Sequence, residues 1–174
     1  MNRRNVSLPQ VRVTPAASAA DWRIAQELLS ELFNWLDQKF RFDAITLQEG
    51  AREETADPAA YYSFPHGMFL LGRVNGEIAG ALGIRFLGDS ETVELKRAWI
   101  RPAYRGTGIS ESLLARSLDA ARALGASRVV LETDARVMPS VVSICRRYGF
   151  REGQPYSSLA KRVPTLLTLE KRVA

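Results

Sequence analysis

The residues with the clearest chemical potential form a short turn between an apolar run and an amphipathic stretch. Arg105-Gly106-Thr107-Gly108-Ile109-Ser110 follows Ile100-Arg101-Pro102 and precedes a helical pattern. Glycines let successive backbone N–H groups crowd together, and the start of a helix adds its partial positive charge. We therefore predict an anion cradle in this turn, suited to a pyrophosphate. These residues alone leave open a plain glycine turn with solvated arginines.

The elements that must position this turn alternate between strands and helices. Strand patterns cover residues 10–14, 68–74, 78–87, 91–101, 129–131 and 165–169, and a further strand starts at Phe150. Helical patterns run from Ser18 or Asp21 to Leu36, near Ile45–Glu54, from 106–110 to Gly125, and from Pro139 to Tyr148. Asn75-Gly76 is the preferred pair for a two-residue type I′ turn. The order predicts an α/β (α+β) domain over 1–174 with one mixed sheet, residues 1–8 forming a flexible arm.

Composition limits the classes of function. The 174 residues include 24 basic and 19 acidic side chains, a net charge of +5, with one cysteine and one histidine. This excess favours anionic partners, but the basic residues are spread along the chain, which favours a mildly basic soluble surface. A single cysteine excludes an internal disulfide, and no apolar stretch reaches the length of a membrane span. We expect a cytoplasmic protein without a metal site, a membrane contact or a nucleic-acid partner.

The stretch Leu95–Phe150 resembles the GNAT superfamily of N-acetyltransferases. The family's phosphate-binding pattern falls on Arg105, Gly108 and Ser110, its strand end on Ile100-Arg101-Pro102, and its later helix motif on Pro139, Ile144-Cys145 and Gly149-Phe150. Ser110 stands where the family commonly has Gly or Ala, and Cys145 where many members have a proton-donating tyrosine. The resemblance implies the acyl-CoA N-acyltransferase fold, a mixed sheet of about seven strands flanked by about four helices.

The resemblance also implies an activity and a co-substrate site. The enzyme would move the acetyl group of acetyl-CoA to a primary amine, on a small molecule or a peptide, by direct attack in a ternary complex. Contacts with the co-substrate would come from Trp99, Ile100, Arg101, Arg105, Gly106, Thr107, Gly108, Ile109 and Ser110. The amides from Arg105 to Ser110 would hold the pyrophosphate, and the strand end would pair with the pantetheine arm. Dimers are common among relatives, so a homodimer is expected as a possible assembly.

Three residues are candidates for the proton transfers. Glu94 is the candidate base, acting directly or through one ordered water; a solvent-facing strand glutamate is the equal alternative. Cys145 and Tyr148 are candidate proton donors for the departing thiolate, although both lie on an apolar helix stripe where packing is the favoured role. Tyr156 is a further possible donor.

The acceptor and the function class have open alternatives. Glu49, Glu53, Glu54 and Asp57 could attract a cationic amine or form a solvated helix face. A non-catalytic acyl-CoA sensor of the same fold would carry the same cradle. Residues 142–150 resemble part of a helix-turn-helix, which makes a nucleic-acid binder the rival from another class.

Overall fold

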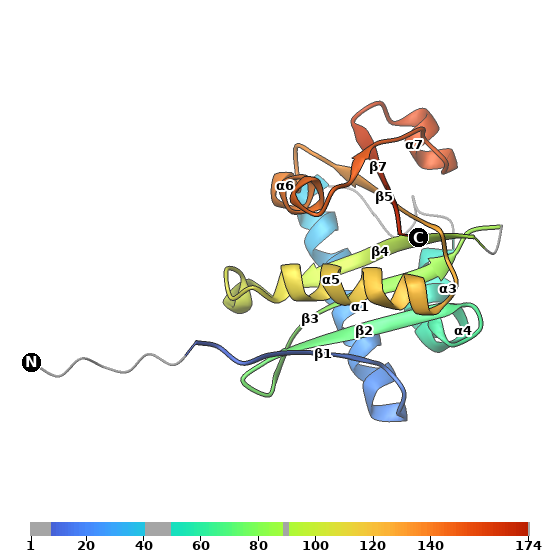
Figure 1. Ribbon diagram of the computed structural model, residues 1–174. Coiled ribbons are helices and arrows are strands. Elements are labelled where there is room, and N and C mark those ends of the chain that lie inside the picture. The colour runs from blue at the N-terminus through green and yellow to red at the C-terminus, as the bar shows by residue number, and fades with distance from the viewer. Residues whose placement is uncertain (1–7, 41–49, 89–90, 174) are drawn as a thin grey trace, which may run out of the picture.

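One mixed sheet organises the computed structural model, which describes residues 8–40, 50–88 and 91–173 (Figure 1). The sheet has seven strands in the order β1-β2-β3-β4-β5-β7-β6. Their bounds are β1 Val11–Pro15, β2 Gly67–Val74, β3 Glu77–Phe86, β4 Thr92–Ile100, β5 Arg128–Asp134, β6 Arg151–Glu152 and β7 Leu166–Arg172. Neighbouring strands are antiparallel except β4 and β5, which are parallel. The predicted mixed sheet of about seven strands is confirmed.

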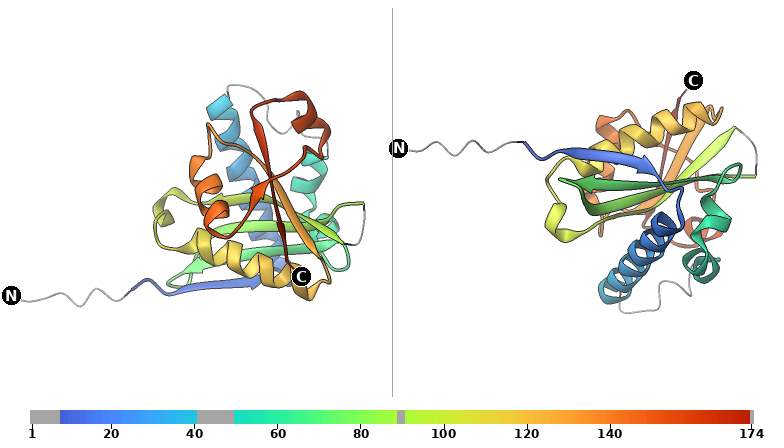
Figure 2. Two further views of the ribbon diagram at one scale, coloured as in Figure 1. Left: turned by 45° about the horizontal axis from the view of Figure 1, so that its top comes forward. Right: turned by 90° about the horizontal axis from the view of Figure 1, so that it is seen from below.

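Helices cover both faces of the sheet (Figure 2). The helices in the described ranges are α1 Ala19–Phe40, α3 Ala51–Ala56, α4 Pro58–Tyr62, α5 Ile109–Ala123, α6 Pro139–Arg147 and α7 Ser158–Arg162, with a 3-10 turn at Pro102–Tyr104. One buried core lies between the sheet and α5 and α6, and a second lies between the sheet and α1, α3 and α4. No helix within the described ranges is long and apolar enough to span a membrane.

The described residues form six helices, where about four were expected. The predicted helix near Ile45–Glu54 lies partly outside the described residues, and α3 begins at Ala51, after Gly50. The additional helices α4 and α7 have five residues each, too few for an apolar period to be visible in the sequence. Each begins instead at a side-chain cap. The Asp57 carboxylate accepts a hydrogen bond from the N–H of Ala60, and the Ser157 hydroxyl accepts one from the N–H of Ala160.

Local sequence signals explain where the other elements begin and turn. Ser18 and Asp21, the two alternative caps of α1, act together, because each accepts a hydrogen bond from the other's N–H at 3.1 Å. Asn75 and Gly76 have φ of 52° and 89°, as the predicted type I′ turn requires. Both predictions are confirmed.

Strand β4 carries a bulge near its middle. Gly83 of β3 faces Lys96, but Ala81 faces Trp99, so Arg97 and Ala98 together oppose a single residue. Arg97 has φ of 57°, a left-handed conformation that is uncommon for a side chain of this size. The bulge sends the Arg97 side chain into the core between the sheet and α1, where it forms a buried ion pair with Glu54.

Strands β4 and β5 separate after a short stretch of pairing. Their register contains Thr92–Arg128, Val93–Val129 and Glu94–Val130. Beyond Glu94, β4 continues to Ile100 and β5 to Asp134, each still paired to its other neighbour. The sheet therefore divides into two arms, one formed by β1 to β4 and the other by β5, β7 and β6. Beyond Glu94 and Val130, no backbone pairing between described residues joins the facing edges of β4 and β5.

Candidate active site

The predicted anion cradle connects the end of β4 to α5. Gly106 and Gly108 have φ of 81° and 85°, and Gly108 directly precedes the first residue of α5. Within the described ranges, no residue accepts a hydrogen bond from the amides of Gly106, Gly108, Ile109 or Ser110. The first N–H groups of a helix have no intrahelical partner, and here left-handed glycines crowd further amides beside them. The turn therefore has the donors and the dipole that an anionic group requires.

The side chains at the end of β4 divide between the cradle and α1. Arg105 is exposed, and its guanidinium lies 5.4 Å from the centre of the Trp99 ring. Arg101 instead contacts α1, where it donates to Glu31 at 2.7 Å and pairs with Glu27. Trp99 Nε1 also donates to Glu31, at 2.9 Å. Arg105 thus remains at the cradle surface, whereas the carboxylates of α1 hold Arg101.

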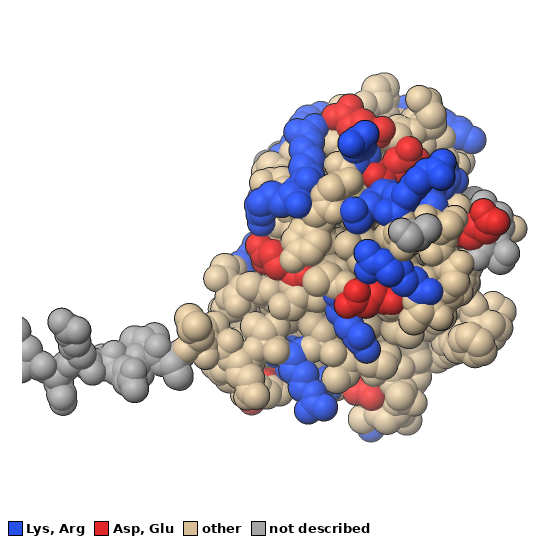
Figure 3. All heavy atoms as spheres, in the orientation of Figure 1, with Lys and Arg blue, Asp and Glu red and all other residues tan. Residues whose placement is uncertain are grey.

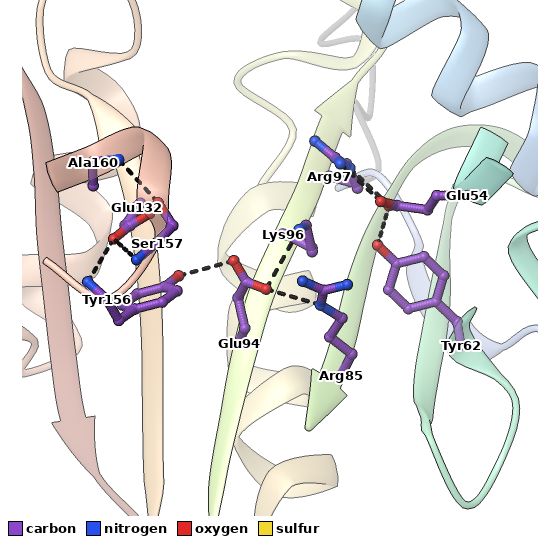
Figure 4. A network of polar contacts seen from close by, with 10 residues as sticks. All are labelled: Glu54, Tyr62, Arg85, Glu94, Lys96, Arg97, Glu132, Tyr156, Ser157 and Ala160. Atoms are coloured by element: carbon purple, nitrogen blue, oxygen red, sulfur yellow. Dashed lines mark hydrogen bonds and ion pairs between the residues drawn. The ribbon is translucent and has the colours of Figure 1, made fainter. Parts of the chain in front are cut away.

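Glu94 lies at the apex, where β4 and β5 separate (Figure 4). The residue is 6% exposed, and three side chains contact its carboxylate. Arg85 Nε donates to Oε2 at 3.0 Å, Lys96 Nζ lies 3.4 Å from the same oxygen, and the Tyr156 hydroxyl donates to Oε1 at 2.9 Å. A carboxylate has about four lone-pair sites. Among the described residues Oε1 has a single partner, the Tyr156 hydroxyl, which leaves a lone-pair position for a water or an incoming amine.

Tyr156 reaches Glu94 from the opposite arm of the sheet. It precedes α7, and its N–H donates to Glu132 of β5 at 3.1 Å, as does the N–H of Ser157 at 3.2 Å. Burial raises the pKa of the Tyr156 hydroxyl, and the charges of Glu94 and Glu132 raise it further. The hydroxyl therefore stays protonated and acts as a donor to Glu94.

A buried ion pair lies beside this network on the same face of the sheet (Figure 4). Arg97 donates to both carboxylate oxygens of Glu54 at 2.7 Å, and Tyr62 donates to the same carboxylate. The side chains of Arg97 and Glu54 are 5% and 2% exposed. Burial alone would raise the pKa of Glu54, but the hydrogen bonds and charge of Arg97 outweigh it and the pKa is lowered. Glu54 is therefore a structural anion, engaged by Arg97.

The two predicted proton donors, Cys145 in α6 and Tyr148 at its C-cap, lie in different surroundings. Cys145 is 3% exposed within the core under α5 and α6, and burial raises the pKa of its thiol to about 11. Tyr148 is half-buried, packs against the same core, and points its hydroxyl at the carbonyl of Glu111, 3.4 Å away in the first turn of α5. Of the two, only Tyr148 places a polar group beside the cradle helix.

Sequence reasoning named two members of the Glu94 network, Glu94 as the base and Tyr156 as a possible donor, and missed that they contact each other and that Arg85 and Lys96 join them. Arg85, Lys96 and Tyr156 converge on Glu94 from β3, β4 and the segment before α7. The alternation of β4 places Lys96 on the same face as Glu94, and the antiparallel register places Arg85 opposite. The positions of Lys96 and Arg85 beside Glu94 could therefore be predicted from the antiparallel pairing of β3 with β4. The contact of Tyr156 with Glu94 could not, because no local sequence signal fixes the path of the chain between β6 and β7.

The surface gives no support to a helix-turn-helix. Helix α6 lies between β5 and β6, so a strand replaces the second helix that the motif requires. Its Arg146 and Arg147 pair with Glu152 and Glu111, at 2.8 Å and 3.0 Å. On the face drawn in Figure 3, basic and acidic side chains are interspersed. Among the described residues, no group of three or more His, Cys, Asp or Glu side chains is arranged to hold a metal.

Comparison with known proteins gives the family. Residues 26–150 match the model of the Acetyltransferase (GNAT) family. Over 120 residues the chain is 31% identical to an uncharacterized N-acetyltransferase of Schizosaccharomyces pombe, a match that covers 68% of this chain and 72% of the relative. Over 107 residues it is 32% identical to an IAA acetyltransferase of Azospirillum brasilense, covering 62% and 69%.

Solved structures share the fold at lower identity. An acetyltransferase of Streptococcus agalactiae superposes with a TM-score of 0.71 at 18% identity, covering 93% of this chain and 98% of that chain. The PaiA N-acetyltransferase of Thermoplasma acidophilum, solved in complex with coenzyme A, has a TM-score of 0.69 at 16% identity, covering 94% and 99%. The chain therefore belongs to the GNAT family of acetyltransferases.

Proposed function

We propose that this acetyltransferase moves the acetyl group of acetyl-CoA to a primary amine, by direct attack within a ternary complex. The observation that carries the proposal is the continuity between the open cradle at Gly106–Ser110, the unpaired edge of β4 and the carboxylate of Glu94 at the apex. These features form one path from an anion site to a candidate base. The coenzyme A complex of the Thermoplasma relative supports coenzyme A as the ligand of such a path.

The proposed donor contacts follow from the surroundings of each residue. The amides of Gly106, Gly108, Ile109 and Ser110 hold the diphosphate, and the exposed Arg105 adds a positive charge. The Thr107 amide, which the resemblance also implies as a contact, donates to the carbonyl of Tyr104 at 3.4 Å. The edge of β4 that β5 leaves without a ladder, at Trp99 and Ile100, pairs with the pantetheine arm as a further strand does, and the arm replaces the contact of Arg105 Nε with the Ile100 carbonyl at 3.3 Å. We do not assign Arg101 to the co-substrate, although the resemblance implies it, because its guanidinium pairs with Glu27 and Glu31. Its role is instead to hold the end of β4 against α1.

Glu94 acts as the proposed base. It takes a proton from the ammonium, directly or through one water at Oε1, and the neutral nitrogen then bonds to the acetyl carbon. Acetyl-CoA supplies a thioester whose carbon–sulfur bond breaks as the carbon–nitrogen bond forms. The amide product keeps the acetyl group, and the departing thiolate takes up a proton.

The surroundings of Cys145 and Tyr148 distinguish the two candidate proton donors to that thiolate. Cys145 is buried in the core, where burial raises the pKa of its thiol to about 11, whereas the Tyr148 hydroxyl lies beside the first turn of α5. We therefore assign Cys145 to packing and retain Tyr148 as the candidate donor.

The test combines a binding measurement with a turnover measurement. Acetyl-CoA is titrated calorimetrically, and release of free thiol is followed with a panel of amines. We expect binding and turnover, and a fall in kcat/KM of about 10²- to 10⁴-fold in Glu94→Gln with the acetyl-CoA Kd unchanged. Glu77→Gln, which neutralises an exposed carboxylate at the start of β3, is the control. Binding without turnover on any amine would favour the sensor alternative, and unchanged kinetics in Glu94→Gln would remove Glu94 from the mechanism.

A further inference from the structure

Positive charge predominates around the proposed base. On this face of the sheet Arg85, Lys96 and Arg97 stand beside the carboxylates of Glu94 and Glu54, three cations against two anions (Figure 4). Glu132, a third carboxylate, lies on the other arm and accepts from the amides of Tyr156 and Ser157. Two cations, Arg85 and Lys96, contact the single carboxylate of Glu94, which favours an acceptor that carries an anionic group beside its ammonium.

The acidic residues predicted to attract a cationic amine do not offset this charge. Arg97 engages both oxygens of Glu54, and Asp57 caps α4. Glu53 is exposed on α3, and Glu49 lies outside the described residues. Among the described members of that set, none presents an uncommitted carboxylate to the Glu94 network.

Arg85 and Lys96 have N–H donors that are not used in their contacts with Glu94. Arg85 donates through Nε to Glu94, and within the described ranges no residue accepts from its two terminal nitrogens. Within the described part of the chain, the polar contact of Lys96 Nζ is with the same Glu94 oxygen, 3.4 Å away. Their side chains are 33% and 17% exposed, so both reach the accessible surface beside the apex. A charged donor in a partly desolvated site gains most from an anionic acceptor.

We propose that the acetyl acceptor is an amino acid, or another amine with an anionic group next to its amino group, and that Arg85 and Lys96 bind that group. The inference rests on the proposed function and names its substrate class. In an α-amino acid the amine and the carboxyl group share one carbon atom. The amine can therefore meet Glu94 at Oε1 while the carboxylate meets the cations that flank Oε2.

The electrostatics of Lys96 agree with this arrangement. Burial lowers its pKa, and repulsion by Arg97 and Arg85 lowers it further, against the attraction of Glu94 and Glu54. A bound carboxylate would raise the pKa of Lys96 again, because it accepts a hydrogen bond from the ammonium group and supplies a negative charge beside it.

Matched acceptors isolate the charge of that group. Each amino acid in a panel is compared with its own carboxamide, which keeps the shape and the carbonyl but lacks the charge, and with the corresponding decarboxylated amine. We expect kcat/KM to be about 10- to 100-fold higher for the amino acid than for its carboxamide. Equal rates for the three, or a preference for the uncharged forms, would overturn the inference and leave the acetyltransferase proposal intact. Absence of turnover on every amine would instead count against the proposed function, and with it this inference.

Variants assign the effect to the named residues. Arg85 and Lys96 also contact Glu94, so the informative quantity is the ratio of kcat/KM for the amino acid to that for its carboxamide. We expect Lys96→Gln and Arg85→Gln to reduce this ratio about tenfold, mainly through KM of the amino acid. Arg116→Gln removes an exposed cation from α5, on the other face of the sheet, and controls for overall charge. An unchanged ratio in both test variants would refute the assignment.

A binding measurement provides a readout that does not require turnover. The N-acetyl amino acid, a product analogue, is titrated calorimetrically into the wild type and the two variants in the presence of coenzyme A. We expect weaker binding in both variants, with no change for the matching N-acetyl carboxamide. Equal loss of both ligands would indicate general damage to the site and would contradict the proposed contact.

Discussion

Replacement of Glu54 by Gln tests whether the buried pair holds the bulge of β4. The substitution keeps the side-chain shape and removes the charge opposite Arg97, whose side chain is only 5% exposed. Breaking a buried pair by neutralising one partner costs about 3–5 kcal/mol, because the other charge stays buried without compensation. For a chain of this size each kcal/mol shifts Tm by about 2–4 °C. We therefore expect a loss of roughly 6–20 °C at neutral pH. Glu53→Gln, one position earlier and exposed, should change Tm by less than about 2 °C.

The pH dependence of this loss provides a second check. The folded-state pKa of Glu54 lies below its ordinary value of 4.5. The stability that its charge contributes is therefore present above that value and disappears as the pH falls through the lower, folded-state pKa. Denaturant unfolding of wild type and Glu54→Gln should thus differ most near pH 7 and converge under acid conditions. A loss below about 1 kcal/mol at pH 7, or a difference that persists in acid, would refute the reasoning.

Two further predictions concern α5 and α6. Gly108→Ala should weaken acetyl-CoA binding at least about tenfold, because φ of 85° is strained for a residue with a side chain. The control is Gly125→Ala, with φ of 82° at the other end of α5, which should destabilise the fold similarly but leave the Kd for acetyl-CoA unchanged. If calorimetry gives the same Kd for Gly108→Ala and the wild type, the proposed cradle is contradicted. Cys145→Ala should cost about 1–2 kcal/mol in denaturant unfolding and keep kcat within about twofold, whereas a large loss of kcat in a folded variant would return Cys145 to the mechanism.

The backbone geometry of the turn at Gly106–Gly108 was accessible from the sequence because its determinants are local. Gly106 and Gly108 adopt the left-handed conformation that their residue type allows, and helix α5 begins directly after them. The β2–β3 hairpin was equally accessible, since Asn75-Gly76 specifies one turn geometry. In both turns, the residue types that allow the prediction are those whose backbone angles define the turn.

The parts that the sequence did not reveal depend on contacts between distant segments. Arg101 lies at the strand end next to the phosphate motif and was a further candidate for phosphate contact, but the packing of α1 against β4 brings Glu27 and Glu31 to its guanidinium. The contact of Tyr156 with Glu94 joins residues 62 positions apart. The bulge at Arg97 appears only when β3 and β4 are set in register, and it also determines that Glu54 is buried as the partner of Arg97.

The central claim is that the amides of the β4–α5 turn bind the diphosphate of acetyl-CoA while its acyl arm runs along β4 toward Glu94. Nitrogen-15-resolved NMR of the labelled protein measures this directly. As acetyl-CoA is added, the amide signals of Gly106, Gly108, Ile109 and Ser110 should move to lower field together with those of Trp99 and Ile100, all with one dissociation constant. Saturable binding that leaves these six signals in place and moves others would contradict the account.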